Sequence, residues 1–305
     1  MPLSERFQRQ VTLLIAAMPF VAAERDFALK GGTAINLFVR DMPRLSVDID
    51  LTYLPVAPRA ASLAAIDAGM KRMAASIRSG LRSVRVNEVV NRMEGIVTKL
   101  TVQGHDAQIK IEVTPVLRGC VFDPEIRSVS SAVEDSFGFA EMQVVSFADL
   151  YAGKIVAALD RQHPRDLFDV RDLLANEGVD NDLRRAFVVY LISHDRPVAE
   201  VIAPRRKDIR GEFERGFDGM AADPVSLEEL VAAREALIAE VAGRMPEAHR
   251  VFLLGFKRGE PDWDLLGVAR AADLPAVKWK QLNLDKLDAP ARAQLVARLE
   301  EVFSQ

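Results

Sequence analysis

The sequence predicts an α+β protein in which a mixed or antiparallel sheet flanked by helices (residues 1–143) precedes an all-helical domain (residues 144–305). Three observations support this prediction. Short segments of the first half alternate polar and apolar residues, which is the period of a half-buried strand. Apolar residues at helical spacing occur before and between these segments. Beyond residue 144 the alternation stops and helix signals predominate to the end of the chain.

The composition is that of a globular protein, with 49% hydrophobic and 28% charged residues among 305. A net charge of −4 gives no overall attraction to nucleic acid, so RNA would have to bind a local basic patch. The single cysteine, Cys120, excludes an internal disulfide and a cysteine-rich zinc site, which fits the cytoplasm. The four histidines do not have metal-ligand spacing.

Residues 3–24 predict an amphipathic helix with Ser4 as its N-cap. The apolar run within it, residues 11–23, is interrupted by Pro19 and is shorter than the ~20 apolar residues that span a bilayer. We therefore expect this helix to pack on the sheet and expect no membrane segment. A short strand over residues 27–29 follows.

Two glycines, Gly31 and Gly32, stand between that strand and the apolar run 34–39, which predicts a short helix. Glycines leave backbone N–H groups accessible at a helix start, where the helix dipole favours an anion such as a triphosphate.

Residues 46–51 alternate as a strand, with Ser46, Asp48 and Asp50 on one face and apolar residues on the other. Two neighbouring carboxylates repel each other unless a cation lies between them, and Mg²⁺ commonly binds one or two carboxylates together with substrate phosphates. A plain turn followed by an acidic edge strand is the alternative. The order and spacing of the two features favour a nucleotide and metal site.

The next segments predict a helix over residues 60–81 and an antiparallel meander of strands over 83–90, 95–102 and 107–114. Glu112 lies on the polar face of the last strand. The helix and its surroundings are basic, and they would either contact RNA phosphates or form a solvated face. These basic residues are Arg59, Lys71, Arg72, Arg78, Arg82, Arg85 and Arg92.

The C-terminal half begins with a predicted helix over residues 147–161, which carries Lys154. Pro164 suits the first turn of the next helix, on which Asp166 and Asp169 share a face and Arg165 could pair with Asp169. Further helices are predicted over residues 182–202, 227–242, 246–256 and 290–303. A second basic cluster follows Pro204 and comprises Arg205, Arg206, Lys207 and Arg210.

Gly-Gly-Thr, a short helix and Ser-x-Asp-x-Asp on a strand together resemble the DNA polymerase beta-type nucleotidyltransferase superfamily. Residues 29–51, LKGGTAINLFVRDMPRLSVDIDL, are most similar to its AbiEii/AbiGii branch, the toxins of type IV toxin–antitoxin systems and their MenT relatives. Lys154 followed by RDLFD (165–169) and the closing segment 277–287 are also similar to this branch.

The resemblance implies transfer of a nucleoside monophosphate from an NTP to an acceptor, the 3′ end of tRNA in the best understood members, with an antitoxin encoded nearby. Two Mg²⁺ ions would be held by Asp48, Asp50 and Glu112. The nucleotide would contact Gly31, Gly32, Thr33, Ser46 and Lys154. Lys154 and Asp166 would join the catalytic cleft from the helical domain, and the sequence leaves open whether Asp166 or Asp169 faces it.

Two other functions fit the same residues. One is a different enzyme on this fold, which would transfer the nucleotide to a small molecule or a protein, or act as a kinase. The other is a non-catalytic nucleotide-binding partner, which the complete set of three carboxylates disfavours. Neither a membrane nor DNA is expected as a partner.

Overall fold

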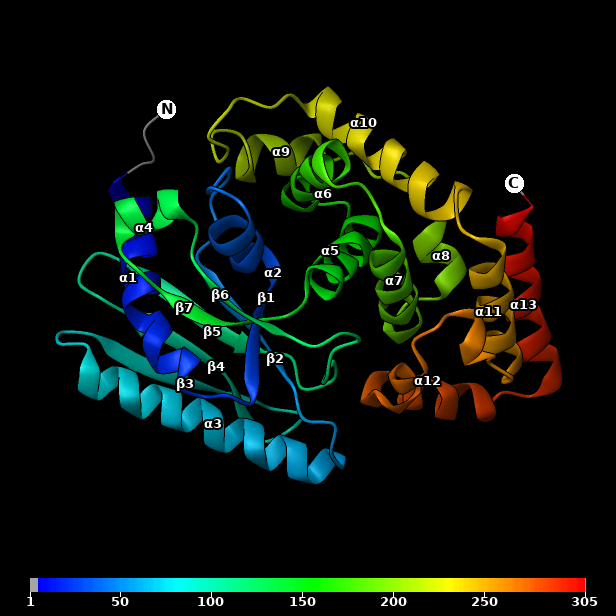
Figure 1. The fold of residues 1–305 in the computed structure, drawn as a ribbon, viewed down its shortest axis with the longest axis horizontal. Helices are drawn as coiled ribbons and strands as arrows, with labels where there is room; N and C mark the ends of the chain where they lie inside the picture. Colours follow the sequence, from blue (N-terminus) through cyan, green and yellow to red (C-terminus); the bar gives the residue numbers. More distant parts are fainter. Residues whose placement is uncertain (1–4, 305) are drawn as a thin grey trace. The chain divides into compact units, whose positions relative to one another are not determined.

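The computed structural model describes residues 5–304, which form two compact units (Figure 1). The first unit comprises Met1–Ser146 and Gly219–Pro224, and the second comprises Phe147–Asp218 and Val225–Gln305. The first unit contains a sheet with helices and the second is helical, so the predicted α+β class is confirmed.

A seven-stranded mixed sheet forms the centre of the first unit, in the order β3-β4-β5-β2-β1-β7-β6. The central strand β2 pairs antiparallel with β1 and parallel with β5. The strands are β1 (Phe27–Lys30), β2 (Asp48–Tyr53), β3 (Arg85–Asn91), β4 (Ile96–Gln103), β5 (Gln108–Val113), β6 (Glu125–Ser128) and β7 (Glu141–Val144).

The meander β3-β4-β5 is antiparallel, as the alternating pattern predicts. Strands β6 and β7 and the helix between them, α4 (Ser131–Phe137), were not predicted. Each of these strands has four residues, which is too short for alternation to distinguish a strand from a loop.

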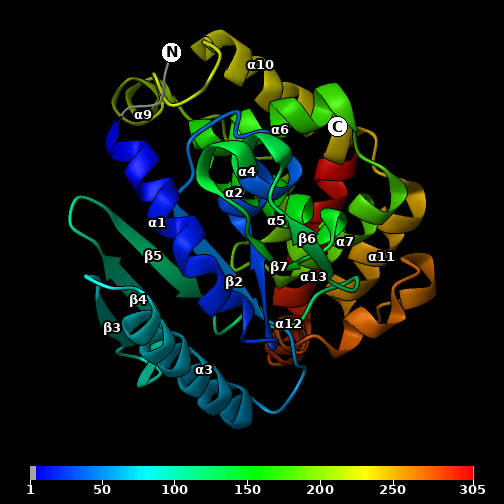
Figure 2. The same ribbon diagram turned by 60° about the vertical axis from the view of Figure 1, so that its left-hand side comes forward.

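Two long helices, α1 (Glu5–Ala22) and α3 (Arg59–Gly80), pack against the sheet and against each other (Figure 2). Both were predicted, and their apolar faces supply fully buried residues such as Leu14, Met18 and Met70. The predicted N-cap, Ser4, lies outside the described residues.

The predicted short helix after β1 is present, but it changes geometry along its length. Gly31–Thr33 (α2) is an α-helical turn, and Ala34–Val39 (η1) is a π-helix in which the Arg40 N–H donates to the Ile35 carbonyl at 2.9 Å. The loop after η1 pairs with residues 219–224, because the Leu45 N–H donates to the Met220 carbonyl at 3.1 Å. These contacts explain why 219–224 belongs to the first unit.

The described residues of the second unit form helices and no strands. Its elements are α5 (Phe147–Arg161), α6 (Pro164–Asn176), α7 (Asn181–Ser193), α8 (Val198–Ile202), α9 (Arg210–Gly216), α10 (Leu227–Ile238), η2 (Ala239–Gly243), α11 (Glu247–Arg258), η3 (Trp263–Leu265), η4 (Ala269–Asp273), α12 (Pro275–Asp285) and α13 (Ala289–Phe303).

The single helix predicted over residues 182–202 is wrong, because α7 ends at Ser193 and α8 begins at Val198. His194 is extended and Pro197 takes the N-cap position of α8, where its missing N–H costs nothing. Among residues 5–304, no helix is both long and apolar enough to cross a bilayer.

Candidate active site

Asp48 and Asp50 lie on the same face of β2 and are half-buried, whereas Ile49 and Leu51 between and beyond them are completely buried. This arrangement follows directly from the alternation of the sequence, because the apolar side of the strand is fixed in the core. The two carboxylates are therefore held side by side at the surface of the central strand.

Glu112 lies on β5, which is the parallel neighbour of β2, and its Cα is in register with that of Asp50. The carboxylate of Glu112 pairs with the Lys99 ammonium at 2.7 Å, and Lys110 is in register with Asp48. The predicted third carboxylate is thus adjacent in the sheet. Within the described chain, however, no three His, Cys, Asp or Glu side chains are close enough to hold a metal together.

The Gly31-Gly32 turn passes close to the Asp50 carboxylate and to the side chains of Ser46 and Arg44. Gly31 has a φ of +76°, and a Cβ at this position would lie 2.6 Å from Oδ2 of Asp50. A Cβ on Gly32 would lie 2.8 Å from Oγ of Ser46 and 2.9 Å from Nη2 of Arg44. Only glycine leaves room for the backbone to approach these side chains so closely.

Thr33 holds the turn against β2. Its side chain is completely buried, and its hydroxyl donates to the Asp48 carbonyl at 2.6 Å and lies 3.1 Å from the Ser46 hydroxyl. The Thr33 hydroxyl proton is therefore directed at the protein backbone. Ser46, which is half-buried just before β2, is the more accessible of the two hydroxyl groups.

Two buried polar residues beside the turn were missed by sequence reasoning. Asn36 donates to the Gly32 carbonyl at 2.8 Å and accepts from the Arg44 N–H at 3.2 Å. The Arg44 side chain is only 3% exposed, and its Nη1 donates to the Leu45 carbonyl at 2.9 Å. A buried guanidinium beside Gly32 and Ser46 makes the turn electropositive, which suits an anion.

Lys30 was also not singled out. It ends β1 and is in antiparallel register with Asp50. Burial lowers the pKa of the Lys30 ammonium, and the negative charge of Asp50 partly opposes this effect. Lys30 thus places a second cationic group next to the carboxylates.

In the second unit, Lys154 of α5 is nearly buried, and its ammonium pairs with two carboxylates of α6. Its Nζ lies 2.7 Å from Asp166 Oδ1 and 3.0 Å from Asp169 Oδ2. The predicted shared face of Asp166 and Asp169 is confirmed, and both residues contact Lys154.

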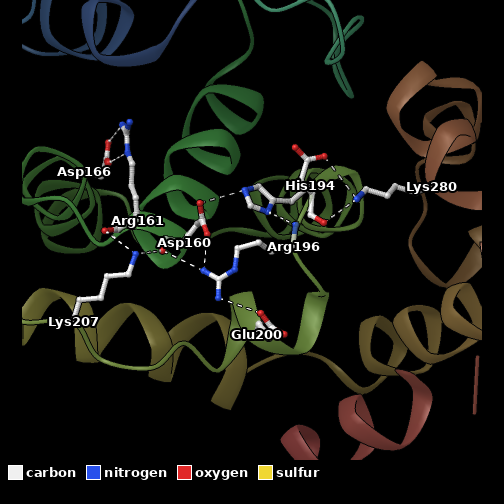
Figure 3. A network of polar contacts seen from close by, with 9 residues as sticks. Asp160, Arg161, Asp166, His194, Arg196, Glu200, Lys207 and Lys280 are labelled. Atoms are coloured by element: carbon white, nitrogen blue, oxygen red, sulfur yellow. Dashed lines mark hydrogen bonds and ion pairs between the residues drawn. The ribbon is translucent and has the colours of Figure 1, made fainter. Parts of the chain in front are cut away.

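Asp166 also accepts two hydrogen bonds from Arg161 at the end of α5, at 2.5 and 2.9 Å, and Figure 3 shows this pair. Burial alone would raise the pKa of the Asp166 carboxyl. The charges of Lys154 and Arg161 outweigh it and hold this pKa well below its usual range. Asp166 is thus an anion that fixes two cationic side chains.

The donor set of the first unit fits a hard cation and a polyphosphate. Two half-buried carboxylates on one strand offer the oxygen ligands that Mg²⁺ prefers, and such ions commonly take further oxygens from substrate phosphates. The adjacent turn combines accessible backbone with Ser46 and Arg44, which are groups that bind phosphate oxygens.

Comparisons with known proteins agree with this chemistry. The sequence model of the nucleotidyl transferase AbiEii toxin family of type IV toxin–antitoxin systems matches residues 12–280. The solved structures with significant similarity include the nucleotidyltransferase toxin MenT4 from Mycobacterium tuberculosis H37Rv, with a TM-score of 0.61 and 15% sequence identity over 91% of this chain and 93% of that one. Among curated proteins, none shows significant sequence similarity.

Proposed function

The chain belongs to the AbiEii nucleotidyltransferase toxin family of type IV toxin–antitoxin systems, and we propose that it transfers a nucleoside monophosphate from an NTP to the 3′ end of tRNA in a Mg²⁺-dependent reaction. Membership makes it a nucleotidyltransferase whose genetic partner is an antitoxin. The observation that carries the proposal is the close approach of the Gly31-Gly32 turn to Asp50 and Ser46. The cytoplasm supplies both proposed substrates.

Asp48 and Asp50 would hold the metal ion, with the triphosphate oxygens as its remaining ligands. Bound Mg²⁺ would neutralise negative charge on the phosphates and would lower the pKa of a coordinated hydroxyl. Glu112 would hold a second ion or accept the proton of the attacking hydroxyl. Lys99, which pairs with Glu112 at 2.7 Å, orients that carboxylate.

The triphosphate would bind at the turn through the Gly32 N–H, the Ser46 hydroxyl and the Arg44 guanidinium. Since the Thr33 hydroxyl donates to the Asp48 carbonyl, we assign Thr33 to positioning both Ser46 and the metal-binding strand. This role replaces the direct phosphate contact that the resemblance suggests for Thr33.

Lys154 would contribute positive charge to the triphosphate. An ammonium group has three N–H donors, and Asp166 and Asp169 accept from it in two directions. The ammonium group thus keeps one N–H donor beyond those that face the two carboxylates. Asp166 and Asp169 act in this proposal as positioning residues, because they fix the ammonium.

In the proposed reaction, the terminal ribose hydroxyl of the acceptor attacks the α-phosphorus of the NTP. A new O–P bond forms, the bond from the α-phosphorus to the bridging oxygen breaks, and pyrophosphate leaves with the bonding electron pair. The hydroxyl proton passes to a carboxylate of the sheet. The protein mainly positions the reactants in line and stabilises charge.

The test is label transfer from each α-labelled NTP in turn to total RNA, with and without Mg²⁺. Wild-type protein should label a tRNA-sized species with one preferred NTP. Asp48→Asn should abolish labelling, whereas Asp135→Asn, at an exposed carboxylate of α4, should not change it. NTP turnover without labelled RNA would refute the tRNA acceptor and would indicate a small-molecule or protein acceptor, or a kinase. Binding of NTP without any turnover would indicate a non-catalytic protein.

A further inference from the structure

A basic pocket lies within the second unit, where residues 204–208 pass the corner between α5 and α6. The cavity has a volume of about 430 Å³ and is lined by Gln162, Arg196 and residues 204–208. This volume falls in the range of ~300–1,000 Å³ that is usual for ligand pockets. The pocket contains the second basic cluster of the sequence, apart from Arg210.

Gln162 fixes the wall of this pocket. Its side chain is 1% exposed, its Nε2 donates to the Arg205 carbonyl at 2.9 Å, and its Oε1 accepts from the Lys207 N–H at 2.9 Å. Arg234, also buried, donates to Gln162 Oε1 and to the Lys207 carbonyl, at 3.2 and 2.8 Å. The backbone on both sides of Arg206 is thus held by buried side chains, so the pocket is preorganised.

The cations of the pocket differ in how far they are neutralised. Arg196 pairs with Asp160 at 2.7 Å and with Glu200 at 3.3 Å, as Figure 3 shows. Arg206 pairs with Glu235 at 2.9 Å.

Lys207 is bound in a different way, because its ammonium donates to the Asp160 carbonyl at 2.9 Å, at the C-terminal end of α5. Arg205 is exposed, and it forms no ion pair with any of residues 5–304. Asp208 is the one acidic residue of the described lining. Among the described residues, Arg205 and Lys207 are therefore the cations of the pocket that form no ion pair with a carboxylate.

We propose that this pocket binds a backbone phosphate of the RNA acceptor, with Arg205 as its main contact and Lys207 as a second cation. The inference rests on the proposed function, because it requires an RNA substrate. A phosphodiester fits better than a nucleotide because no aromatic side chain lines the pocket, so a base has no ring on which to stack. Cationic contacts of this kind position a nucleic acid without reading its sequence.

The pocket is connected to the Lys154 group through one short stretch of chain. Gln162, which holds the pocket wall, follows Arg161, which binds Asp166, and Asp166 binds Lys154. An acceptor strand whose phosphate sits in this pocket would thus be anchored to the same helix corner that orients Lys154. The pocket would position the acceptor and take no part in bond making.

The test is binding of fluorescently labelled tRNA across a salt series by the full-length protein and its variants. Arg205→Glu should weaken binding about five- to tenfold at ~0.1 M salt, and the slope of log affinity against log salt should become shallower by about 0.7–0.9, the value for one lost phosphate contact. Arg205→Lys should bind nearly as the wild type does. The matched control is Lys278→Glu, an equal charge change at an exposed residue of α12.

Binding of Mg-NTP should be the same in all these variants. If Arg205→Glu binds tRNA as well as Lys278→Glu does, while wild-type protein still labels tRNA, the pocket assignment is wrong and the proposed function stands. If wild-type protein neither binds nor labels tRNA, the acceptor assignment fails and the pocket proposal fails with it. Loss of inorganic phosphate or NTP binding in Arg205→Glu, with tRNA affinity intact, would identify a small-anion site and overturn the RNA proposal.

Discussion

Gly31→Ala tests whether activity requires the close approach of the glycine turn to the proposed metal-binding carboxylates. Gly31 has a φ of +76°, in the left-handed region that costs an L-residue about 1–2 kcal/mol. In addition, the new Cβ would lie 2.6 Å from Asp50 Oδ2, whereas ordinary contact begins at 3.4 Å. Because aspartate is short and β2 is held on both sides, the carboxylate would have to shift by about 0.8 Å.

Gly31→Ala should reduce both thermal stability and nucleotide transfer, and the two effects can be measured separately. The backbone cost should lower the melting temperature by about 2–8 °C, because 1 kcal/mol corresponds to about 2–4 °C in a domain of 150–250 residues. The displaced carboxylate should reduce nucleotide transfer by about 10²-fold, the usual effect of misplacing a reacting group by ~1 Å. Thermal melting measures the first part, and label transfer at saturating NTP measures the second.

Gly95→Ala is the matched control in the same unit. Gly95 connects β3 to β4 with a φ of +69°, and a Cβ there would meet nothing within 4 Å. Gly95→Ala should therefore show the backbone part of the stability loss, with unchanged activity. If Gly31→Ala retained wild-type activity, or if Gly95→Ala lost as much activity as Gly31→Ala, the close-approach argument would be refuted.

Three further predictions concern polar groups that are buried or half-buried. Asp166→Asn should destabilise the protein by about 1.5–3 kcal/mol at pH 7, because it removes the carboxylate that Lys154 and Arg161 share, while Asp169 still pairs with Lys154. Since the folded pKa of Asp166 lies below its unfolded value near 3.8, this stabilisation is present above about pH 4 and is lost as the pH falls further, so wild-type and variant melting temperatures should converge in acid. Burial lowers the pKa of Lys257 to about 8 from 10.5, so its charged form opposes folding below pH 8. Lys257→Met should raise stability at pH 7 by up to about 3 kcal/mol, and urea titrations should show this gain shrinking between pH 8 and 10.5. Thr33→Val should cost about 1–3 kcal/mol, since it leaves the Asp48 carbonyl without the Thr33 donor, and it should also weaken NTP binding; an unchanged melting temperature would contradict this.

The sequence predicted the structure best where a pattern of residue spacing is compatible with only one kind of element. Alternation with period two predicted β2 and the β3-β4-β5 meander, because only one register buries Ile49 and Ile111. That Glu112 lies beside Asp50 was implied by the family resemblance and not by the alternation, and the structure places the two in register. Their proposed roles in binding metal stay predictions.

Residues whose importance comes from contacts distant in sequence could not be predicted in this way. Arg44 looks like an ordinary loop arginine, yet it is buried against the Gly32 turn because Asn36 binds its backbone and residues 219–224 pair with its loop. No local pattern encodes contacts with a segment about 175 residues away. The π-helical turn after Thr33 could not be predicted from residue spacing either, because its apolar residues fit an α-helix equally well.

The contacts of Lys154 show which features residue spacing can predict and which require the structure. Positions i and i+3 on a helix place Asp166 and Asp169 on one face, and the sequence alone suggested that one of them would face the site. An ammonium group can donate in three directions, and in the structure Lys154 pairs with both carboxylates. The two carboxylates are not equivalent, because Asp166 also binds Arg161. Two carboxylates around one buried lysine leave excess negative charge, which Arg161 offsets. Lys154, Arg161, Asp166 and Asp169 therefore form one charge-balanced group. The distance along the chain between Lys154 and Asp166 is set by the turn between α5 and α6, which brings the two helices together.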